Sequence, residues 1–168
     1  DINNYHPTFP KSLNILTVNP QVKPDEILLK TIQNLKDYQN PRIITIAIDP
    51  GMEKSGVAFF LDKKFIYSRS VYSLERILHW IMIAFHAFPF QIKQIKLGNG
   101  YKKLTTKFLR YFYKNLSDYD IEYILVNERR TSRRRWRHSG SFGSIHEKSA
   151  MLIGLRSGEI ISAETLPS

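Results

Sequence analysis

Residues 43–61 read IITIAIDPGMEKSGVAFFL, and this stretch decides the fold. It opens with a continuous run of apolar and β-branched residues, 43–48, which is typical of a strand buried on both faces of a sheet. The Pro-Gly pair at 50–51 ends the run, because proline lacks a backbone N–H and glycine permits a sharp turn. A second apolar run, 57–61, follows. The pattern predicts a central strand that ends in the carboxylate of Asp49 and then folds back as a hairpin.

The rest of the chain shows alternating strand and helix patterns. Further strands are expected at 65–71, 91–97 and 121–126, and helices at 73–88, 101–116 and from 145 to about 156, with Gly158 ending the last one. A strand–helix–strand crossover joins parallel neighbours and is almost always right-handed. We therefore predict an α/β fold with a five-stranded mixed sheet of order 3-2-1-4-5 and helices on both faces.

Three polar residues follow the strands that should run parallel: Asp49, Asn99 and Glu128. In open α/β sheets the carboxyl ends of parallel strands meet at one edge, where functional sites form. These three side chains are therefore expected to lie close together.

Two further segments shape the expected organisation. Residues 1–41 read as an arm with a short strand at 14–18 and a helix from 24 to about 38, appended to a main domain at 42–168. The helix at 73–88 is apolar nearly all round, so it is either buried deeply or covered by the arm or by a second copy in a homodimer.

Composition narrows the possible partners. The chain has 168 residues and a net charge of +10, which makes polyanions such as nucleic acid the first candidates. It has no cysteine, so disulfides and thiolate metal sites are excluded and a cytoplasmic location is expected. A membrane helix is not expected, because the most apolar window, 77–92, is short for a bilayer and contains His79, His86 and Pro89.

Four motifs in this order resemble those of the RuvC-type Holliday junction resolvases and their YqgF-like relatives, including the Tex proteins. Residues 48–58, IDPGMEKSGVA, look like the first motif of the family, and 97–100, LGNG, look like the motif after the fourth strand of the YqgF-like branch. Residues 126–132, VNERRTS, are similar to that branch's glutamate motif, and 146–150, HEKSA, lie where the family opens its last helix.

The resemblance implies a ribonuclease-H-like fold and cleavage of phosphodiester bonds in structured nucleic acid, dependent on Mg²⁺ or Mn²⁺. Asp49 and Glu128 would be the metal ligands, with His146 and Asn99 assisting catalysis. The sequence differs from the resolvases at two positions. Asn99 stands where they carry a glutamate, and Ser149 stands where they carry an aspartate.

Each candidate also has a purely structural interpretation. Asp49 could cap a turn, Glu128 could pair with a neighbouring arginine, and Asn99 between two glycines suits a left-handed turn. His146 is either a ligand or proton donor, or a solvent-facing residue of the first helical turn. Glu147 fits a capping box with Ser144 better than a ligand role.

Basic residues follow Glu128 directly. The segment 129–143 contains six arginines and a tryptophan that suit phosphate binding and base stacking: Arg129, Arg130, Arg133, Arg134, Arg135, Trp136 and Arg137. Lys103, Lys107 and Arg110 should form a basic stripe on one face of the helix at 101–116. Solvated charge is the alternative interpretation for both groups.

Three functions are therefore compared. The first is a metal-dependent nuclease, acting on DNA or RNA. The second is a nucleic-acid-binding module that kept the fold and lost an acid, as Asn99 and Ser149 suggest. The third is an actin-like nucleotide-binding domain, which needs a second acidic phosphate loop that 98–100 does not supply.

Overall fold

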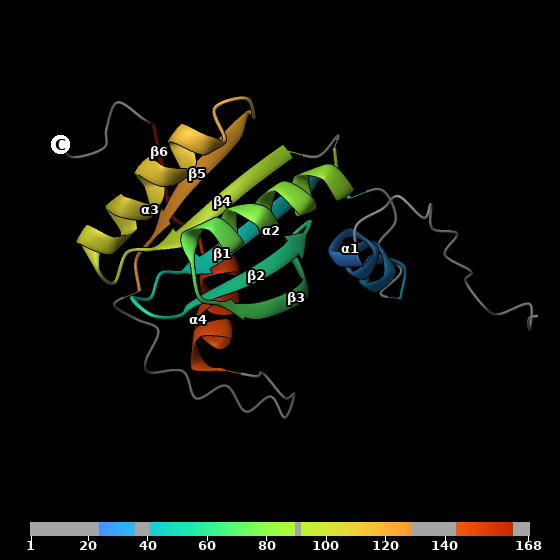
Figure 1. Ribbon diagram of the computed structural model, residues 1–168, viewed down its shortest axis with the longest axis horizontal. Coiled ribbons are helices and arrows are strands. Elements are labelled where there is room, and N and C mark those ends of the chain that lie inside the picture. Colours follow the sequence, from blue (N-terminus) through green and yellow to red (C-terminus); the bar gives the residue numbers. More distant parts are fainter. Residues whose placement is uncertain (1–23, 36–40, 90–91, 129–143, 163–168) are drawn as a thin grey trace, which may run out of the picture.

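A six-stranded open sheet lies at the centre of the computed structural model (Figure 1). The structure describes residues 24–35, 41–89, 92–128 and 144–162. The elements are, in chain order, α1 (Pro24–Leu35), β1 (Ile43–Asp49), β2 (Ser55–Leu61), β3 (Lys64–Val71), α2 (Leu74–Ala87), β4 (Ile92–Gly98), α3 (Lys102–Asn115), β5 (Ile121–Val126), α4 (Ile145–Gly154) and β6 (Glu159–Ile161). The strand expected at 14–18 lies outside the described residues.

The strands stand in the order β3-β2-β1-β4-β5-β6, which confirms the predicted order of the first five. β1 pairs antiparallel with β2 and parallel with β4, and β4 pairs parallel with β5. The first three strands form the predicted antiparallel meander. The carboxyl ends of β1, β4 and β5 therefore meet at one edge of the sheet.

The predicted count of five strands was wrong, because β6 adds a sixth by pairing antiparallel with β5. This strand has three residues and its Ile160 is 68% exposed. It is therefore too short for an alternation of apolar and polar residues to reveal it in the sequence. The helix end expected at Gly158 was also wrong, since α4 ends at Gly154. Gly158 instead lies against β5, where a Cβ atom would overlap the carbonyl oxygen of Leu125.

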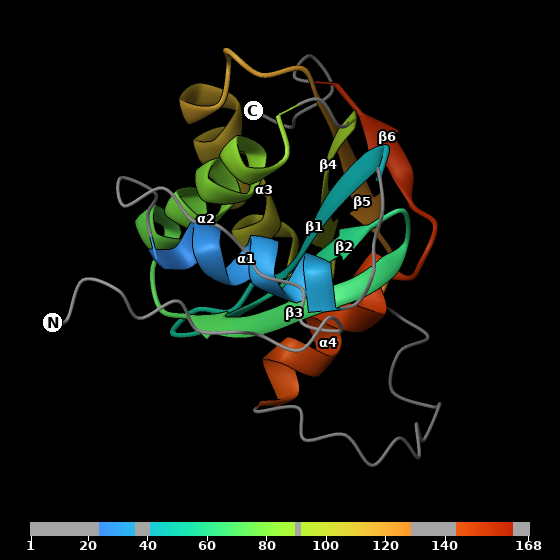
Figure 2. The ribbon, with the colours of Figure 1, turned by 90° about the vertical axis from the view of Figure 1, so that its right-hand side faces the viewer.

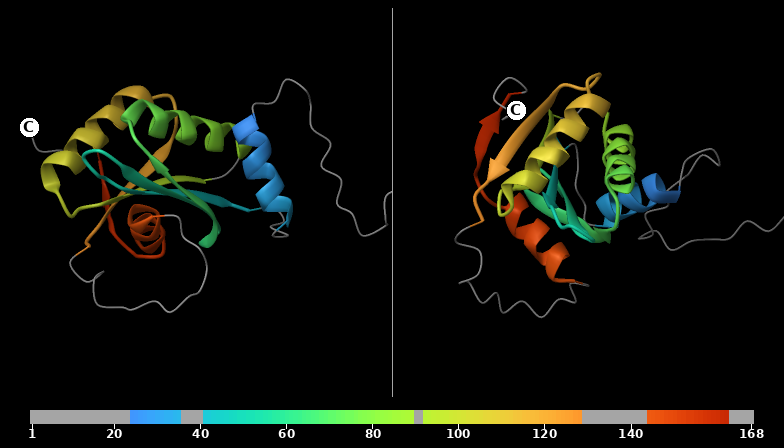
Figure 3. Two further views of the ribbon diagram at one scale, coloured as in Figure 1. Left: turned by 60° about the horizontal axis from the view of Figure 1, so that its bottom comes forward. Right: turned by 60° about the vertical axis from the view of Figure 1, so that its left-hand side comes forward.

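Helices cover both faces of the sheet, as predicted (Figure 3). α2 and α3 lie on one face and α4 lies on the other. Alternation along β1 sends Ile44, Ile46 and Ile48 to the α2 side, whereas Ala47 joins the cluster that contains residues of α4. Asp49 has the same parity as Ala47, so its side chain lies on the α4 face.

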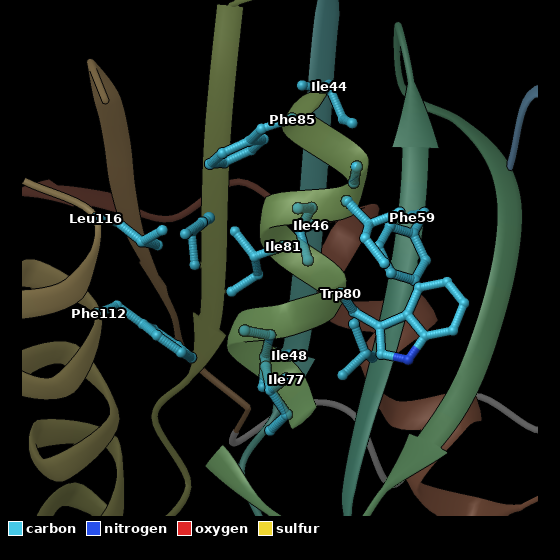
Figure 4. Close-up of a cluster of buried hydrophobic side chains, with 14 of the residues drawn as sticks. Ile44, Ile46, Ile48, Phe59, Ile77, Trp80, Ile81, Phe85, Phe112 and Leu116 are labelled. Atoms are coloured by element: carbon cyan, nitrogen blue, oxygen red, sulfur yellow. The ribbon is translucent and has the colours of Figure 1, made fainter. Parts of the chain in front are cut away.

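The larger core cluster lies between α2 and the sheet (Figure 4). Trp80 is 1% exposed and packs on Phe59, with ring centroids 5.9 Å apart. Ile77, Ile81 and Phe85 bury the neighbouring turns of the helix against β1 and β4. Full burial of one such side chain stabilises the fold by about 1.5–3 kcal/mol, so this face supplies most of the hydrophobic stabilisation.

The α4 face is built from smaller side chains. Ala47 and Ala58 are fully buried beneath the helix. A Cβ atom at Gly154 would overlap the ring of Phe60, so glycine is needed where α4 crosses this ring. The small residues allow α4 to lie close to β1 and β2, and its first turn consequently reaches the end of β1.

α1 packs on α2 and β3 (Figure 2). Leu29 of α1 is 1% exposed and belongs to the larger core cluster, whereas its neighbour Leu28 is 37% exposed. Two side-chain pairs join α1 to α2, Asp25 with His79 at 3.4 Å and Glu26 with His86 at 3.6 Å. The apolar helix 73–88 is thus covered by the N-terminal segment, one of the expected alternatives.

Within the described parts of the chain, no helix combines the length and the apolar character needed to cross a bilayer.

Candidate active site

Asp49 lies at the carboxyl end of β1 and contacts the first turn of α4. Its Oδ2 atom is 3.0 Å from Nδ1 of His146, 97 positions later in the chain. The side chain of Asp49 is 14% exposed and that of His146 is 37% exposed, so water and a ligand can reach the pair from one side. The structure therefore brings together two of the predicted site residues, and the capping interpretation of Asp49 is replaced by a contact with α4.

Two glycines of the first motif, Gly51 and Gly56, lie close to other backbone, and Gly56 makes room for the backbone of His146. Gly56, the register partner of Asp49 on β2, lies so close to α4 that a Cβ atom there would overlap the carbonyl oxygen of His146. A Cβ atom at Gly51 would overlap the backbone oxygen of Lys54 and lie 3.5 Å from the imidazole Cε1 of His146. The first motif thus positions both partners of the Asp–His pair. It contains Asp49, and its Gly56 packs against the backbone of His146.

Three hydroxyl and carboxylate groups fix the start of α4 on β3. The N–H of Glu147 donates to Oγ of Ser144 at 3.3 Å, and Oγ of Ser70 donates to Oε1 of Glu147 at 2.7 Å. The two serine oxygens are 2.7 Å apart, and because Ser70 gives its proton to Glu147, Ser144 donates to Ser70. The predicted Ser144 cap is confirmed. The other half of the capping box was wrong, since the Glu147 carboxylate bonds Ser70 on β3.

Glu128 follows β5 and folds back over the end of β4. Its Oε1 accepts a hydrogen bond from the N–H of Gly100 at 3.0 Å. A Cβ atom at Gly98 would overlap Oε1 of Glu128, and one at Gly100 would lie 3.1 Å from it. The two glycines of the 97–100 motif therefore serve to seat the Glu128 carboxylate, a role that the sequence pattern did not reveal.

Asn99 lies between these glycines and is half-buried. Its N–H donates to the carbonyl oxygen of Val126 at 3.0 Å, which fixes the turn after β4 against the end of β5. Among the described residues only Asp62 and Lys63 have positive φ, so the left-handed turn proposed for Asn99 is wrong. The Asn99 side chain makes no hydrogen bond to another residue in the described part of the chain.

Both carboxylates of the candidate site are harder to ionise than usual, and the charge of Asp49 acts on Glu128. Burial raises the pKa of Asp49 from its ordinary value, against the hydrogen bond and charge of His146, which lower it. Burial also raises the pKa of Glu128, the Gly100 N–H lowers it, and the negative charge of Asp49 raises it. Each group is thus harder to ionise than usual, Asp49 because it is buried, and Glu128 because it is buried and lies near the charge of Asp49.

This donor set suits a hard divalent cation. Carboxylate oxygens are the protein ligands that Mg²⁺ prefers, and one or two of them, with water and phosphate, commonly complete its shell. A cation between Asp49 and Glu128 would offset the repulsion that raises the pKa of Glu128. Over the described ranges no three His, Asp or Glu side chains form one metal-ligating cluster. The fit therefore rests on two carboxylates.

The basic residues are placed only in part. Lys103, Lys107 and Arg110 are exposed on α3, whose opposite face buries Phe108 and Phe112, so the predicted stripe is confirmed as a surface. The predicted phosphate-binding segment, from Arg129 to Arg137 with Trp136, lies outside the described residues.

Replacing Gly56 with alanine is expected to displace the first turn of α4. The added Cβ meets backbone, which cannot move aside as a side-chain tip can, so we expect a loss of unfolding free energy of about 1–3 kcal/mol, typical of overpacking. We also expect changed NMR shifts of the His146 imidazole, because the Asp49 contact is lengthened.

Gly158→Ala is the matched control, since its Cβ also meets backbone but at β5, away from the site. It should lower stability while leaving the His146 imidazole shifts unchanged. If the NMR shifts of the His146 imidazole changed from wild type by the same amount in Gly56→Ala and Gly158→Ala, the role given to Gly56 would be contradicted.

The sheet order and the crossover helices on two faces define a ribonuclease-H-like fold. No family model matches this sequence. No curated protein matches it either. Among solved structures, the chain is similar to T. thermophilus RuvC in complex with a Holliday junction substrate. The TM-score is 0.51 and the sequence identity is 12%, over 68% of this chain and 91% of that chain. At this identity the similarity establishes the fold.

Proposed function

We propose that this chain is a divalent-metal-dependent endonuclease that hydrolyses phosphodiester bonds in branched or structured nucleic acid. The observation that carries the proposal is the pairing of Asp49 with His146 beside the electrostatically coupled Glu128, at the edge where β1, β4 and β5 end. The structurally similar RuvC is bound to a Holliday junction, which supports this class of substrate.

Asp49 and Glu128 would hold the metal, and Mg²⁺ or Mn²⁺ bound there would supply a Lewis acid and lower the pKa of a coordinated water. The chain's own groups supply the rest. The Nδ1–H of His146 donates to Asp49, which leaves Nε2 as the atom that takes or gives a proton. Asn99, at the turn between Gly98 and Gly100, would orient water or a phosphate oxygen by its side-chain amide.

Binding would rest on the basic surfaces. Lys103, Lys107 and Arg110 project from the helix that begins beside Gly100, so their stripe extends away from the candidate site. The arginine-rich segment 129–143 follows Glu128 of the candidate site directly in the sequence and ends before Ser144, the N-cap of the helix that carries His146. We propose that the arginines of this segment bind phosphates of the substrate strand.

Cleavage assays test the proposal directly. An end-labelled four-way DNA junction and an RNA hairpin are incubated with the wild-type chain in Mg²⁺, in Mn²⁺ and in EDTA. We expect discrete cuts near the branch or loop of one substrate, present with either metal and absent with EDTA. The substrate that is cut also decides between DNA and RNA.

A second candidate function is non-catalytic nucleic-acid binding. Two observations favour it: Asn99 and Ser149 replace acids that the resolvases carry, and only two carboxylates meet at the described site. If this function is correct, the logarithm of the binding constant falls linearly with the logarithm of the salt concentration. No substrate is cut with either metal. Tight binding without any cleavage would favour it over the nuclease.

The remaining expectations accompany either function as proposals. These are the division into an arm at 1–41 and a domain at 42–168, a cytoplasmic location, a homodimer, and the closer likeness to the YqgF branch. A homodimer that uses α2 would have to leave α1 in place, because α1 already covers part of that helix. Light scattering of the full chain measures its mass in solution and so tests whether it is a homodimer.

A further inference from the structure

A cavity of about 240 Å³ lies on the other side of the loop that follows Asp49. Gly51 lines it, and a Cβ atom at this glycine would lie 3.5 Å from the His146 ring. The cavity opens toward α2 and α3, whereas Asp49 and His146 lie on the α4 face of the sheet. The cavity and the candidate active site are therefore neighbours separated by one turn of chain.

The walls combine apolar surface with charge at the rim. Tyr72 and Met52 stand at the cavity 74% and 84% exposed, and Leu104 and Phe108 of α3 lie along it. Large apolar side chains with so much exposed surface gain free energy when a flat apolar group covers them. Lys107, one of the stripe residues, also lines the cavity and brings a positive charge to it.

The size of the cavity limits what it can hold. Sites for drug-sized ligands span roughly 300–1,000 Å³, so 240 Å³ suits a single flat ring system. Nucleobases stack on exposed aromatic side chains, and phosphates pair with lysines on the same groove. An aromatic ring, an apolar wall and one lysine are the groups that one nucleotide of an unpaired strand requires.

We propose that this cavity takes one unstacked nucleobase of the nucleic-acid substrate, stacked on Tyr72 with its phosphate at Lys107. The inference rests on the proposed function. The unstacked base would belong to the strand that is cut, and a phosphate next to this base in the strand would be the one at Asp49. This site gives a reason for a preference for branched or structured substrates, because their unpaired bases enter without the cost of breaking a base pair.

Acceptor groups at the rim add selectivity. The carboxylates of Glu53 and Glu75 line the cavity and are exposed. The pKa of Glu75 is lowered, first by a backbone hydrogen bond and then by one with Ser73, so this group is a charged acceptor at neutral pH. Bases that present an exocyclic amino group are favoured at such a rim over bases that present only carbonyl oxygens.

The test uses 2-aminopurine, a fluorescent base that stacking quenches, placed in turn at each branch or loop position of the four-way junction and the RNA hairpin. Complexes are formed with Ca²⁺ in place of Mg²⁺, and emission is compared between wild type and Tyr72→Ala. We expect one position at which the Tyr72→Ala complex is several times brighter than the wild-type complex. We also expect affinity to fall about tenfold, the usual cost of one lost stack.

Two further variants make the result specific. Leu104→Phe enlarges a wall residue and should also brighten that position, because it expels the base while keeping Tyr72. Tyr119→Ala removes a tyrosine at the opposite edge of the sheet, beside Phe85, and should leave emission and affinity unchanged. Circular dichroism confirms that each variant is folded.

The outcomes separate the two proposals. If a probe is bound and cut in Mg²⁺ but emission is the same in wild type and Tyr72→Ala at every position, the base site is wrong and the nuclease proposal stands. If neither probe is bound, the proposed function fails and the base site fails with it.

Discussion

Asp49→Asn is expected to abolish metal-dependent cleavage while leaving the chain folded and able to bind nucleic acid. Changes to groups that merely orient metal ligands cost roughly 10- to 100-fold, so loss of a ligand should cost more, on the order of 1,000-fold in rate. The amide keeps the size of the side chain and an oxygen that can accept from His146, but it removes the negative charge that would hold the cation and strengthen this hydrogen bond. Single-turnover cleavage of the preferred substrate measures this loss.

The fold should tolerate the change. Burial raises the pKa of Asp49, so the folded state binds its proton more tightly than the unfolded chain does. The contribution of Asp49 to stability is therefore lost as the pH rises from the pKa of the unfolded chain through the raised pKa of the folded state. A neutral amide does not ionise, so it removes this loss at pH 7. We expect an unfolding free energy equal to or slightly above that of wild type.

Asp118→Asn provides the control, because Asp118 is exposed in the turn after α3, far from the candidate site. This variant should cut at the wild-type rate. Unchanged cleavage by Asp49→Asn would remove Asp49 from the mechanism. An unfolded variant would show instead that the carboxylate is structural.

The strand order and the meeting of strand ends could be predicted from the sequence because they follow from local patterns. The continuous apolar run of β1 requires cover on both faces, and crossovers of known hand fix where the later strands pair. Asp49 and Glu128 therefore converge for reasons that depend only on strand direction. A second local pattern, the capping box, correctly placed Ser144 at a helix start.

The contacts between distant residues could not be predicted in this way. Gly98 and Gly100 resemble turn residues until Glu128, 28 positions after Gly100, is seen to lie against them. Ser70 looks like any strand serine, although it bonds Glu147, 77 positions away. Such roles depend on which side chain arrives from another element, and the sequence does not record this as a periodicity.

Trp80→Ala is expected to be the most destabilising single substitution among those proposed. Trp80 is 1% exposed and packs on Phe59 and Tyr67. The guanidinium of Arg69 lies over its ring, with Cζ 4.2 Å from the ring centroid. Removing a buried tryptophan side chain typically costs about 3–5 kcal/mol through lost burial and the cavity left behind. The Nε atom of Arg69 is buried without a hydrogen bond in the described structure, so losing the ring also removes its main favourable contact.

Chemical denaturation followed by circular dichroism measures this cost without relying on tryptophan fluorescence. Met82→Ala is the matched control on the same helix, since Met82 is 44% exposed and its truncation should change stability by no more than about 0.5 kcal/mol. A cost below about 1 kcal/mol for Trp80→Ala would contradict the packing described for α2.

The same variant separates stability from catalysis. Trp80 lies on the α2 face of the sheet, whereas Asp49 and His146 meet on the α4 face. Domains of this size are stable by about 5–15 kcal/mol, so a loss of 3–5 kcal/mol leaves a folded population at low temperature. At 10 °C the cleavage rate per folded molecule should therefore equal that of wild type, while at 37 °C activity should fall with the folded fraction. A reduced rate at both temperatures, at equal folded fraction, would show that the two faces of the sheet are coupled.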